Sequence, residues 1–216
     1  MARSSSLHGP SELEPRGARR KRETRSKLLA AALRLMAEKG LDAVAINEIT
    51  EAADVGFGSF YNHFESKEAI YQAVVDSVFE EFADWLDGLL ADVHDPAEVI
   101  SASVRHTVAR AQNEPLWGQF LIREGFPMHA VNRGLGRRVL RDIQKGIDVG
   151  RFLNGDAFMS FVAVSGAVLA SIAVALTDLH RFSTEHWPER CAAVVLQTLG
   201  LDQQAANEIA RRPLPS

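Results

Sequence analysis

Apolar side chains recur every three or four residues along almost the whole chain, and this helical period restricts the fold more than any other feature. It predicts a first helix that ends at Gly40, two short helices, and a long helix from Ser66 to Leu89. Further helices are predicted to open at Asp95-Pro96 and Glu114-Pro115 and to span residues 133–149, 156–177, 185–199 and 202–211. No segment alternates apolar and polar residues as a strand does. The sequence therefore predicts an all-α protein.

Charge is divided unevenly between the two ends of the chain. The 216 residues carry a formal net charge of -4, but residues 1–67 carry +2 and the remainder carries -6. Seven of the basic residues fall between Arg16 and Lys27, where only Glu23 opposes them. Such a run is either the solvated start of a helix or an arm that faces a polyanion. The acidic total excludes a uniformly basic nucleic-acid-binding protein.

Motifs typical of metal, redox and nucleophilic sites are missing. The chain has no HExxH, CxxC, GxSxG or P-loop motif, and its seven histidines are scattered. Its one cysteine, Cys191, can form no internal disulfide. Gly134-Leu135-Gly136 begins like a dinucleotide fingerprint but lacks the third glycine and a preceding strand. We therefore expect a protein that is not an enzyme, has no cofactor or metal, and works in a reducing, cytoplasmic compartment.

One segment is apolar enough to be compared with a membrane span. Residues 157–177 contain no charged side chain and are rich in Ala, Ser and Gly. Asp156 and Asp178 bracket the segment without the Lys/Arg asymmetry of an inserted helix. A helix that is apolar all round lies in a core or an interface of a soluble protein, so we expect no membrane contact.

Residues 41–67 contain two short helices that meet at a tight turn around residues 54–56, the arrangement of a helix-turn-helix. If Phe60 and Phe64 face inward, the outward face carries almost no charge and makes a poor solvated surface. Its hydroxyl, amide and imidazole groups suit phosphates, and its aromatic ring suits a thymine methyl group. The pattern predicts double-stranded DNA as a partner. The outward residues are Phe57, Ser59, Tyr61, Asn62 and His63.

This segment resembles the TetR family of one-component transcriptional regulators. The resemblance covers about residues 24–70, and its most specific part runs from Gly58 to Phe64, followed by Ser66-Lys67. Beyond residue 70 only the number and length of the helices agree. The resemblance implies a dimeric DNA-binding protein, usually a repressor, that a small ligand releases from its operator. The other matching residues are Gly40-Leu41, Ile46, Ile49, Ala52-Ala53, Val55 and Glu68.

The first stretch, to about Gly17, is rich in Ser, Pro and Gly and has no apolar period, so we expect residues 1–18 to be a disordered basic arm. The resemblance implies that residues 19–67 are the DNA-binding domain and 68–216 the ligand-binding and dimerisation domain, and it implies roles for single residues. Tyr61, His63 and Lys67 would contact phosphates, and Phe57 to Ser59 would face the groove. The candidate DNA-binding residues are Arg25, Asn47, Phe57, Gly58, Ser59, Tyr61, Asn62, His63 and Lys67.

Three positions depart from the family pattern. Val44-Ala45 stands where the family usually has Thr or Ser, which removes a helix cap and a phosphate contact. Asp54 stands at the turn position that is usually Gly, and Phe57 stands where Lys or Arg is frequent. These departures concern the contacts to bases and not the fold.

The second domain is expected to hold a pocket for a small apolar or aromatic ligand of unknown identity. Its aromatic residues can equally belong to the core. His106 and Arg110 are the possible polar anchors. The candidate ligand-binding residues are Phe82, Trp85, His106, Arg110, Trp117, Phe120, Phe158 and Phe161.

Small residues in segment 156–177 and an apolar stripe in segment 185–199 predict a dimer. We expect these two helices to pair with their copies across a two-fold axis in a four-helix interface. The same axis would place two recognition helices on one side of a duplex and require a palindromic operator. The candidate interface residues are Gly166, Ala170, Ala173, Cys191, Val194, Val195 and Leu199.

Two alternatives stay open. An activator of the same fold would differ only in where its operator lies relative to a promoter. An all-α small-molecule binding protein or enzyme without DNA binding would not be retained on duplex DNA at low salt.

Overall fold

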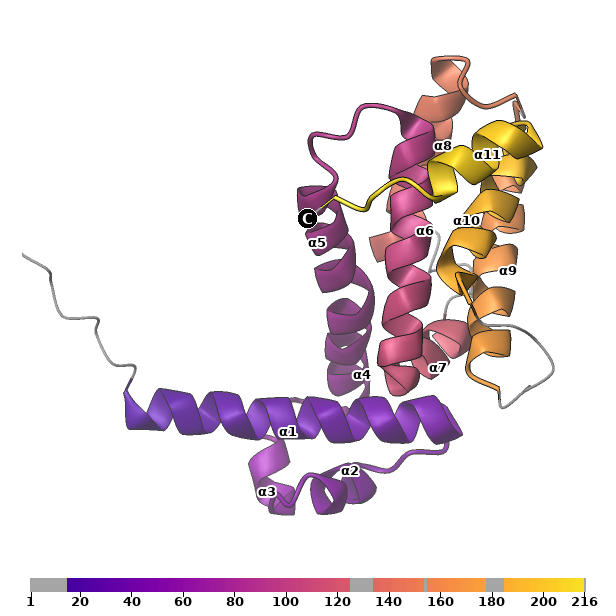
Figure 1. Cartoon of the computed structure of the whole chain (residues 1–216). Coiled ribbons are helices and arrows are strands. Elements are labelled where there is room, and N and C mark those ends of the chain that lie inside the picture. Colours follow the sequence, from indigo (N-terminus) through magenta and orange to yellow (C-terminus); the bar gives the residue numbers. More distant parts are fainter. Residues whose placement is uncertain (1–14, 125–133, 154, 178–184, 216) are drawn as a thin grey trace, which may run out of the picture.

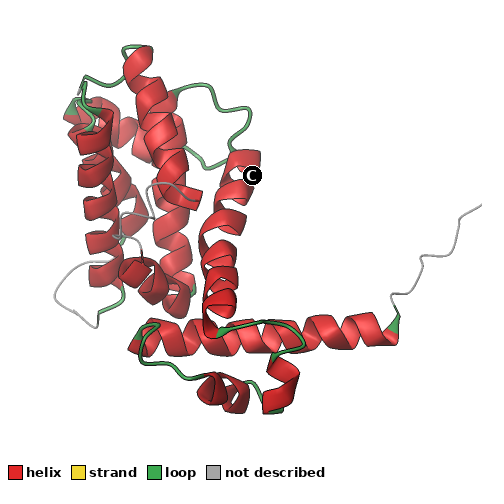
Figure 2. Ribbon diagram, turned by 180° about the vertical axis from the view of Figure 1, so that it is seen from behind, coloured by secondary structure: helices red, strands yellow, loops and turns green. Residues whose placement is uncertain are grey.

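The computed structural model describes residues 15–124, 134–153, 155–177 and 185–215. These residues form helices and connecting segments without a strand (Figure 2), which confirms the all-α prediction. Residues 1–14 of the expected basic arm lie outside the described part. The first helix already begins at Arg16, inside the segment assigned to that arm.

The N-terminal unit is a long helix with two short helices beneath it (Figure 1). The three helices are α1 (Arg16–Lys39), α2 (Ile46–Ala52) and α3 (Phe57–Phe60). At the end of α1, Gly40 has φ +82° and ψ 161°. The positive φ is typical of a glycine that ends a helix, but the ψ angle differs from that of the left-handed helical cap expected there. Leu28 and Met36 are fully buried, whereas Leu29 and Leu33 of the expected stripe are only partly buried.

The second unit stands across α1, and its longer helices lie side by side (Figure 1). α6 packs along α10, and α9 packs against α6, α7, α8 and α10. The elements are α4 (Lys67–Val75), the π-helical turn η1 (Asp76–Glu80), α5 (Glu81–Leu89), α6 (Pro96–Asn113), α7 (Pro115–Glu124), α8 (Gly134–Asp148), α9 (Ala157–Ala175), α10 (Trp187–Thr198) and α11 (Gln203–Ala210).

Short polar side chains fix where several of these helices begin. Ser66 Oγ accepts a hydrogen bond from the Ala69 amide at 3.2 Å, which confirms the predicted cap of α4. Asp95 accepts from the Ala97 amide at 2.9 Å, and Pro96 follows at the first position of α6. Asp156 and Asp202 cap α9 and α11 in the same way.

The long helix predicted from Ser66 to Leu89 is confirmed: it runs from Lys67 to Leu89 without a break, and η1 is a π-helical turn within it. The start of α8 is docked on this turn, where the Gly134 amide donates to Glu80 Oε1 at 2.7 Å. Gly134 has φ +43°, and a Cβ at this position would lie 2.7 Å from the carbonyl carbon of Phe79. Only glycine allows this approach. The glycine that began the false dinucleotide motif therefore has a packing role.

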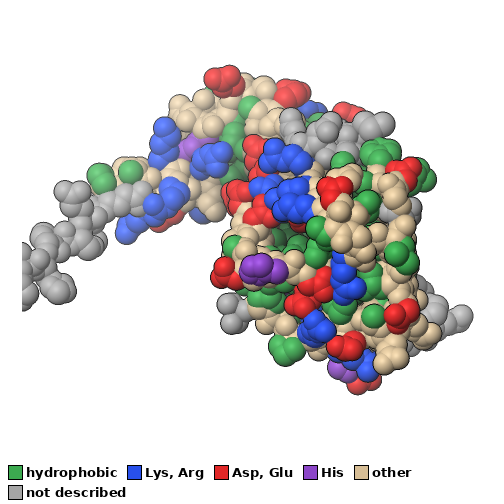
Figure 3. Space-filling model, turned by 90° about the horizontal axis from the view of Figure 1, so that it is seen from above, with side chains coloured by type: hydrophobic (Ala, Val, Ile, Leu, Met, Phe, Trp, Pro, Cys, Tyr) green, Lys and Arg blue, Asp and Glu red, His purple; other side chains and the backbone are tan. Residues whose placement is uncertain are grey.

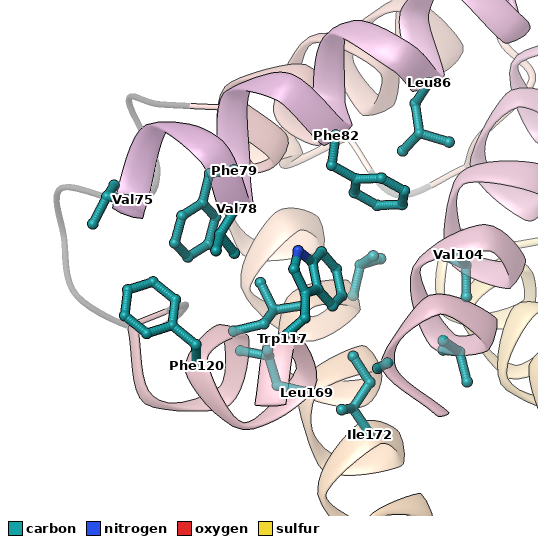
Figure 4. Packing of buried hydrophobic residues seen from close by; sticks show 14 of the residues in the cluster. Val75, Val78, Phe79, Phe82, Leu86, Val104, Trp117, Phe120, Leu169 and Ile172 are labelled. Carbon is teal, nitrogen blue, oxygen red and sulfur yellow. The ribbon is translucent and has the colours of Figure 1, made fainter. Parts of the chain in front are cut away.

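One hydrophobic core runs through both units. It extends from Leu28 and Phe60 under α1 to Phe120 and Ile172 in the second unit. Figure 4 shows Trp117 between the side chains of Phe79 and Phe82 and those of α9. In the described part of the chain, α9 is the one helix long and apolar enough to span a membrane. Its packing against four other helices makes it a helix of the bundle.

Candidate nucleic-acid interface and effector site

The turn between α2 and α3 has the geometry of a helix-turn-helix. Asp54 adopts φ +53°, the left-handed conformation that the family pattern usually gives to glycine. The Val55 amide donates to the Thr50 carbonyl at 2.9 Å and closes the turn. α2 has no side-chain cap at Ala45, but Glu48 accepts a hydrogen bond from the Ala45 amide at 2.9 Å. This bond supplies half of a capping box and partly replaces the missing Thr or Ser.

Two lysines hold the loop between α1 and α2 and the start of α2. Lys39 Nζ lies 2.7 Å from Glu48 Oε1, and the hydrogen bond from Lys39 is the main reason why the pKa of Glu48 is lowered. Lys67 Nζ donates to the Leu41 carbonyl at 3.2 Å. A second, longer bond runs to the Asp42 carbonyl at 3.5 Å, so one of the three donors of the ammonium is left for a phosphate.

Phe60 and Phe64 face inward as predicted, but the predicted outward residues Ser59 and His63 are partly buried. Phe60 is fully buried and Phe64 is 5% exposed, whereas Phe57 is 53% and Tyr61 is 51% exposed. The remaining candidate DNA-binding residues are all at least partly accessible. Arg25, Asn47, Gly58 and Asn62 are exposed, and Ser59, His63 and Lys67 are partly buried. Their contacts to DNA stay predictions.

Successive edge-to-face contacts between aromatic rings hold the exposed side chains of Phe57 and Tyr61 in place. The ring of Phe57 meets Tyr61 edge to face at 5.7 Å, and Tyr61 in turn meets buried Phe60 at 5.3 Å. The Arg25 guanidinium lies 5.0 Å from the centre of the Phe64 ring. These contacts connect the outward face of α3 to the core and to α1.

Positive charge gathers beside this face. Figure 3 shows Lys and Arg side chains along the projecting half of α1. Burial lowers the pKa of His63, and the charges of Lys21 and Arg25 lower it further. A phosphate that approaches this side of the protein would act on the pKa of His63 in the opposite direction.

The second unit contains an apolar cavity of about 90 Å³ between η1, α6, α7, α8 and α9. Its polar atoms are hydroxyl groups, and Thr107 Oγ1 donates to the Ser103 carbonyl at 2.7 Å. The lining residues are Phe79, Ile100, Ser103, Val104, Thr107, Leu121, Leu135, Gly136, Val139, Phe161, Val164, Ser165, Val168 and Leu169.

A charged groove of about 270 Å³ adjoins this cavity and shares four lining residues with it. The shared residues are Ile100, Ser103, Leu135 and Val139. The groove lies between α5 and α8 and adds Asp87, Arg138, Arg141, Asp142 and Lys145. Figure 3 shows a hollow with hydrophobic side chains at its base beside intermixed acidic and basic side chains.

Arg138 is the centre of the ionic network in this groove. Its guanidinium contacts Glu80 at 3.0 Å, Asp87 at 2.7 Å, and Asp84. Arg141 binds Asp87 at 2.8 Å. The hydrogen bond from Arg141, followed by that from Arg138, lowers the pKa of Asp87 against the opposing effect of burial. The groove thus offers fixed donors and acceptors at the edge of an apolar cavity.

Most of the predicted ligand-binding residues do not line the cavity. Phe161 does, but Phe120 is fully buried against Phe79, and Phe158 is 47% exposed on α9. The other five form a separate cluster in which Phe82 stacks on Trp85 and the Arg110 guanidinium lies 4.8 Å from both the Phe82 and Trp117 rings. His106 meets the edge of Trp85. Their role in binding a ligand stays a prediction, and only Phe161 among them lines this cavity.

The groove residues were missed by sequence reasoning. Arg138, Arg141, Asp142 and Lys145 follow one another at helical spacing on a basic amphipathic segment. Charged residues at this spacing usually form a solvated face. The only local signal is the pair Asp84 and Asp87 on an earlier helix, and it does not reveal which helix lies opposite. Their contact is a result of tertiary packing.

The outer face of α9 and α10 is apolar, but not through all the residues predicted. Cys191, Val195 and Leu199 are buried inside the protomer and do not face outward. Burial also raises the pKa of the Cys191 thiol. Val194 is 55% exposed, Ala170 is exposed, and Gly166 and Ala173 are partly buried. Phe158, predicted as a ligand-binding residue, lies exposed on α9 together with Met159 and Val162, none of which was predicted for the interface.

Two family models match the chain. The model described as bacterial regulatory proteins of the tetR family matches residues 28–74. The model described as the tetracyclin repressor-like C-terminal domain matches residues 95–212. The similarity therefore extends beyond residue 70, where the sequence alone offered only a matching architecture.

Solved structures and curated relatives agree with these matches. RolR in complex with its ligand resorcinol is 38% identical, with a TM-score of 0.67, over 92% of this chain and 98% of that chain. The fatty acid degradation regulator FadR from Bacillus halodurans has a TM-score of 0.69 at 15% identity, over 83% of this chain and 97% of that chain, and shares the fold.

Among curated proteins, the transcriptional repressor KstR2 from Mycolicibacterium smegmatis is 37% identical over 73 residues, 34% of each chain. The repressor DhaR from Mycobacterium sp. is 38% identical over 72 residues, 33% of this chain and 36% of that protein. The matches thus span about a third of these two relatives.

Proposed function

Because the chain belongs to the TetR family of bacterial regulatory proteins, we propose that it is a cytoplasmic transcriptional repressor that a small effector releases from DNA. The observation that carries this proposal is the α3 surface. Two half-exposed aromatic side chains, Phe57 and Tyr61, lie next to the basic half of α1 on an otherwise acidic protein. A surface of this kind suits the phosphates and base edges of a duplex.

The repressor is proposed to bind as a homodimer through α9 and α10. Phe158, Met159, Val162 and Val194 are exposed along this face, which is more apolar surface than scattered single residues explain. A two-fold axis there would make the operator palindromic.

Substitutions at two adjacent valines of α10 test the proposed dimer. Val194→Asp places a charge on the exposed face and should yield folded monomers of 23.7 kDa with weak operator binding. Val195→Asp places the charge in the protomer core and should lower stability instead. Sedimentation and thermal unfolding separate the two effects. A dimeric Val194→Asp variant with full operator affinity would rule this interface out.

The proposed effector is a small, mainly apolar molecule with hydroxyl groups. The cavity suits an apolar ring, and the groove beside it offers the carboxylates of Asp87 and Asp142 as acceptors and Arg138 and Arg141 as donors. The resorcinol bound to RolR, a dihydroxybenzene, supports this class. Fully apolar compounds would leave the charged groove without partners, so we expect them to bind more weakly.

The experiment that tests the function is a selection of bound DNA from random duplexes with the full chain. An enriched palindrome is the expected result, and its affinity should fall steeply with salt. Resorcinol is then titrated into the complex. The apolar control is 1,3-dimethylbenzene, in which methyl groups replace the two hydroxyl groups of resorcinol. Release by resorcinol and not by the control supports the effector class, whereas no enrichment of any sequence would contradict the DNA-binding function.

A further inference from the structure

We propose that Phe57 reads thymine methyl groups in the major groove, so that each operator half-site carries a thymine at the position facing this ring. The inference rests on the proposed function, because it names the base feature that the same DNA-binding surface recognises. Phe57 opens α3, which lies on the side of α1 away from the second unit (Figure 1).

The ring of Phe57 is both accessible and fixed. It is 53% exposed, yet it meets Tyr61 edge to face at 5.7 Å, and Tyr61 meets the fully buried Phe60 at 5.3 Å. The ring therefore cannot fold back into the core, which Phe60 already fills. An exposed aromatic side chain held in this way gains by covering apolar surface on a partner.

The chemistry of the surrounding residues restricts what this partner surface can be. Residues 56–64 contain no Lys, Arg, Asp or Glu. The segment therefore has no guanidinium or ammonium for the bidentate contact that reads guanine, and no carboxylate to accept from cytosine. Among the base edges in the major groove, the apolar group is the C5-methyl of thymine. Phe57 stands where the family often has a cation, so this chain replaces a polar contact with an apolar one.

Neighbouring groups supply the contacts that do not depend on sequence. Lys21 and Arg25 lie close enough to His63 to lower its pKa, which places two cations of α1 beside α3. Together with the Tyr61 hydroxyl they can hold the phosphate backbone on either side of the ring. Phosphate contacts fix the position of the protein along the duplex, and the ring of Phe57 then distinguishes thymine from the other bases.

The test uses deoxyuridine, which differs from thymidine only by the methyl group. Each thymine of the selected operator is replaced singly, and affinity is measured with the full-length protein. Loss of one buried methyl should weaken binding about three- to fivefold at the position facing Phe57. In Phe57→Ala the thymine and uracil operators should bind equally. Tyr61→Phe, which keeps the ring and loses the hydroxyl, should bind both more weakly and preserve their ratio.

The outcomes separate this inference from the proposed function. A selected operator that binds thymine and uracil equally well at every position would overturn the role of Phe57 and leave DNA binding intact. A thymine preference that persists in Phe57→Ala would also overturn it, because the methyl effect would then come from DNA shape. Absence of any selected duplex would overturn both. Thermal unfolding of Phe57→Ala checks that this exposed position does not affect the fold.

Discussion

The DNA-binding unit and the second unit build their surfaces in different ways. In the first, a single stretch of residues 57–64 supplies both the buried rings of Phe60 and Phe64 and the exposed rings of Phe57 and Tyr61. In the second, the walls of the cavity come from η1, α6, α7, α8 and α9, which are distant in the sequence. Local periodicity is therefore enough to describe the first surface, whereas the second depends on how helices are placed against one another.

The two units also differ in where their charged side chains come from. Around α3 the exposed side chains are neutral, and the charges that assist them come from the neighbouring α1. In the groove, Arg138 of α8 is surrounded by Glu80 of η1 and Asp84 and Asp87 of α5. Gly134 allows this approach because a side chain there would meet the backbone of Phe79. Five predictions test how far the contrast holds.

The largest effect is expected from Phe60→Ala. The ring is fully buried, so its removal should lower the free energy of unfolding by about 3–5 kcal/mol. Phe57→Ala in the same short helix should change it by less than about 0.5 kcal/mol, because Phe57 is half exposed. Urea unfolding followed by circular dichroism measures both.

The same experiment shows whether the two units unfold together. Trp85, Trp117 and Trp187 all lie in the second unit, so tryptophan fluorescence reports on it alone. Since one core cluster runs through both units, the fluorescence transition of Phe60→Ala should shift with the circular dichroism transition. A fluorescence transition at the wild-type position would show two units of independent stability.

A smaller loss is expected from Arg138→Met. Removing the guanidinium leaves three carboxylates close together, and we expect a loss of about 2 kcal/mol, below the range for a fully buried pair because the carboxylates are partly exposed. Arg137→Met, at an exposed position of the same helix, serves as the control and should cost less than about 0.5 kcal/mol.

The ionic network around Arg138 also predicts how the stability of the protein changes at acid pH. Hydrogen bonds from Arg138 and Gly134 lower the pKa of Glu80 although burial opposes them, and Arg141 lowers that of Asp87. Carboxyl groups with a lowered pKa stabilise the fold above their unfolded values near pH 4, and this contribution is lost as pH falls through the folded values. Stability between about pH 4.5 and 2 should therefore vary less in Arg138→Met than in the wild type.

An intermediate effect is expected from Tyr71→Phe, which tests how α4 is held against α7, the two helices of the second unit that contact α1. The Tyr71 hydroxyl on α4 donates to Glu124 Oε2 on α7 at 2.6 Å, and α7 also carries Leu121 in the cavity wall. Loss of the bond should reduce the coupling between effector and operator by about 1 kcal/mol. The measurement is operator affinity with and without resorcinol. An unchanged ratio would place the coupling elsewhere, for instance at η1.

The smallest effect concerns His63. Burial and the charges of Lys21 and Arg25 lower its pKa in the free protein, and a DNA phosphate would raise it again. Binding would then take up a proton, so operator affinity should rise slightly as pH falls from 8 to 6. His63→Gln should flatten this pH profile. The same slope in both proteins would assign the pH dependence to other groups.

Much of the fold could be predicted because helix ends and periods are local properties. The caps at Ser66 and Asp95 act within three residues of themselves, and the glycine that opens α8 lies where the period predicted a helix start. The π-helical turn η1 could not be predicted, because its partner is the start of α8 more than fifty residues later. Which aromatic residues border the cavity could not be predicted for the same reason: Phe120 and Phe161 are both apolar aromatics, and only Phe161 lines the cavity.

The sequence by itself determined the helices, the helix-turn-helix and the two faces of α3, because each depends on residues within one or two turns of each other. The tertiary structure decided which faces of the apolar helices are covered. On α10, Val194 and Val195 are adjacent and chemically identical, yet one is 55% exposed and the other fully buried. Successive helical residues point about 100° apart. The position of α6 along α10 therefore selects Val195 for the core and leaves Val194 exposed.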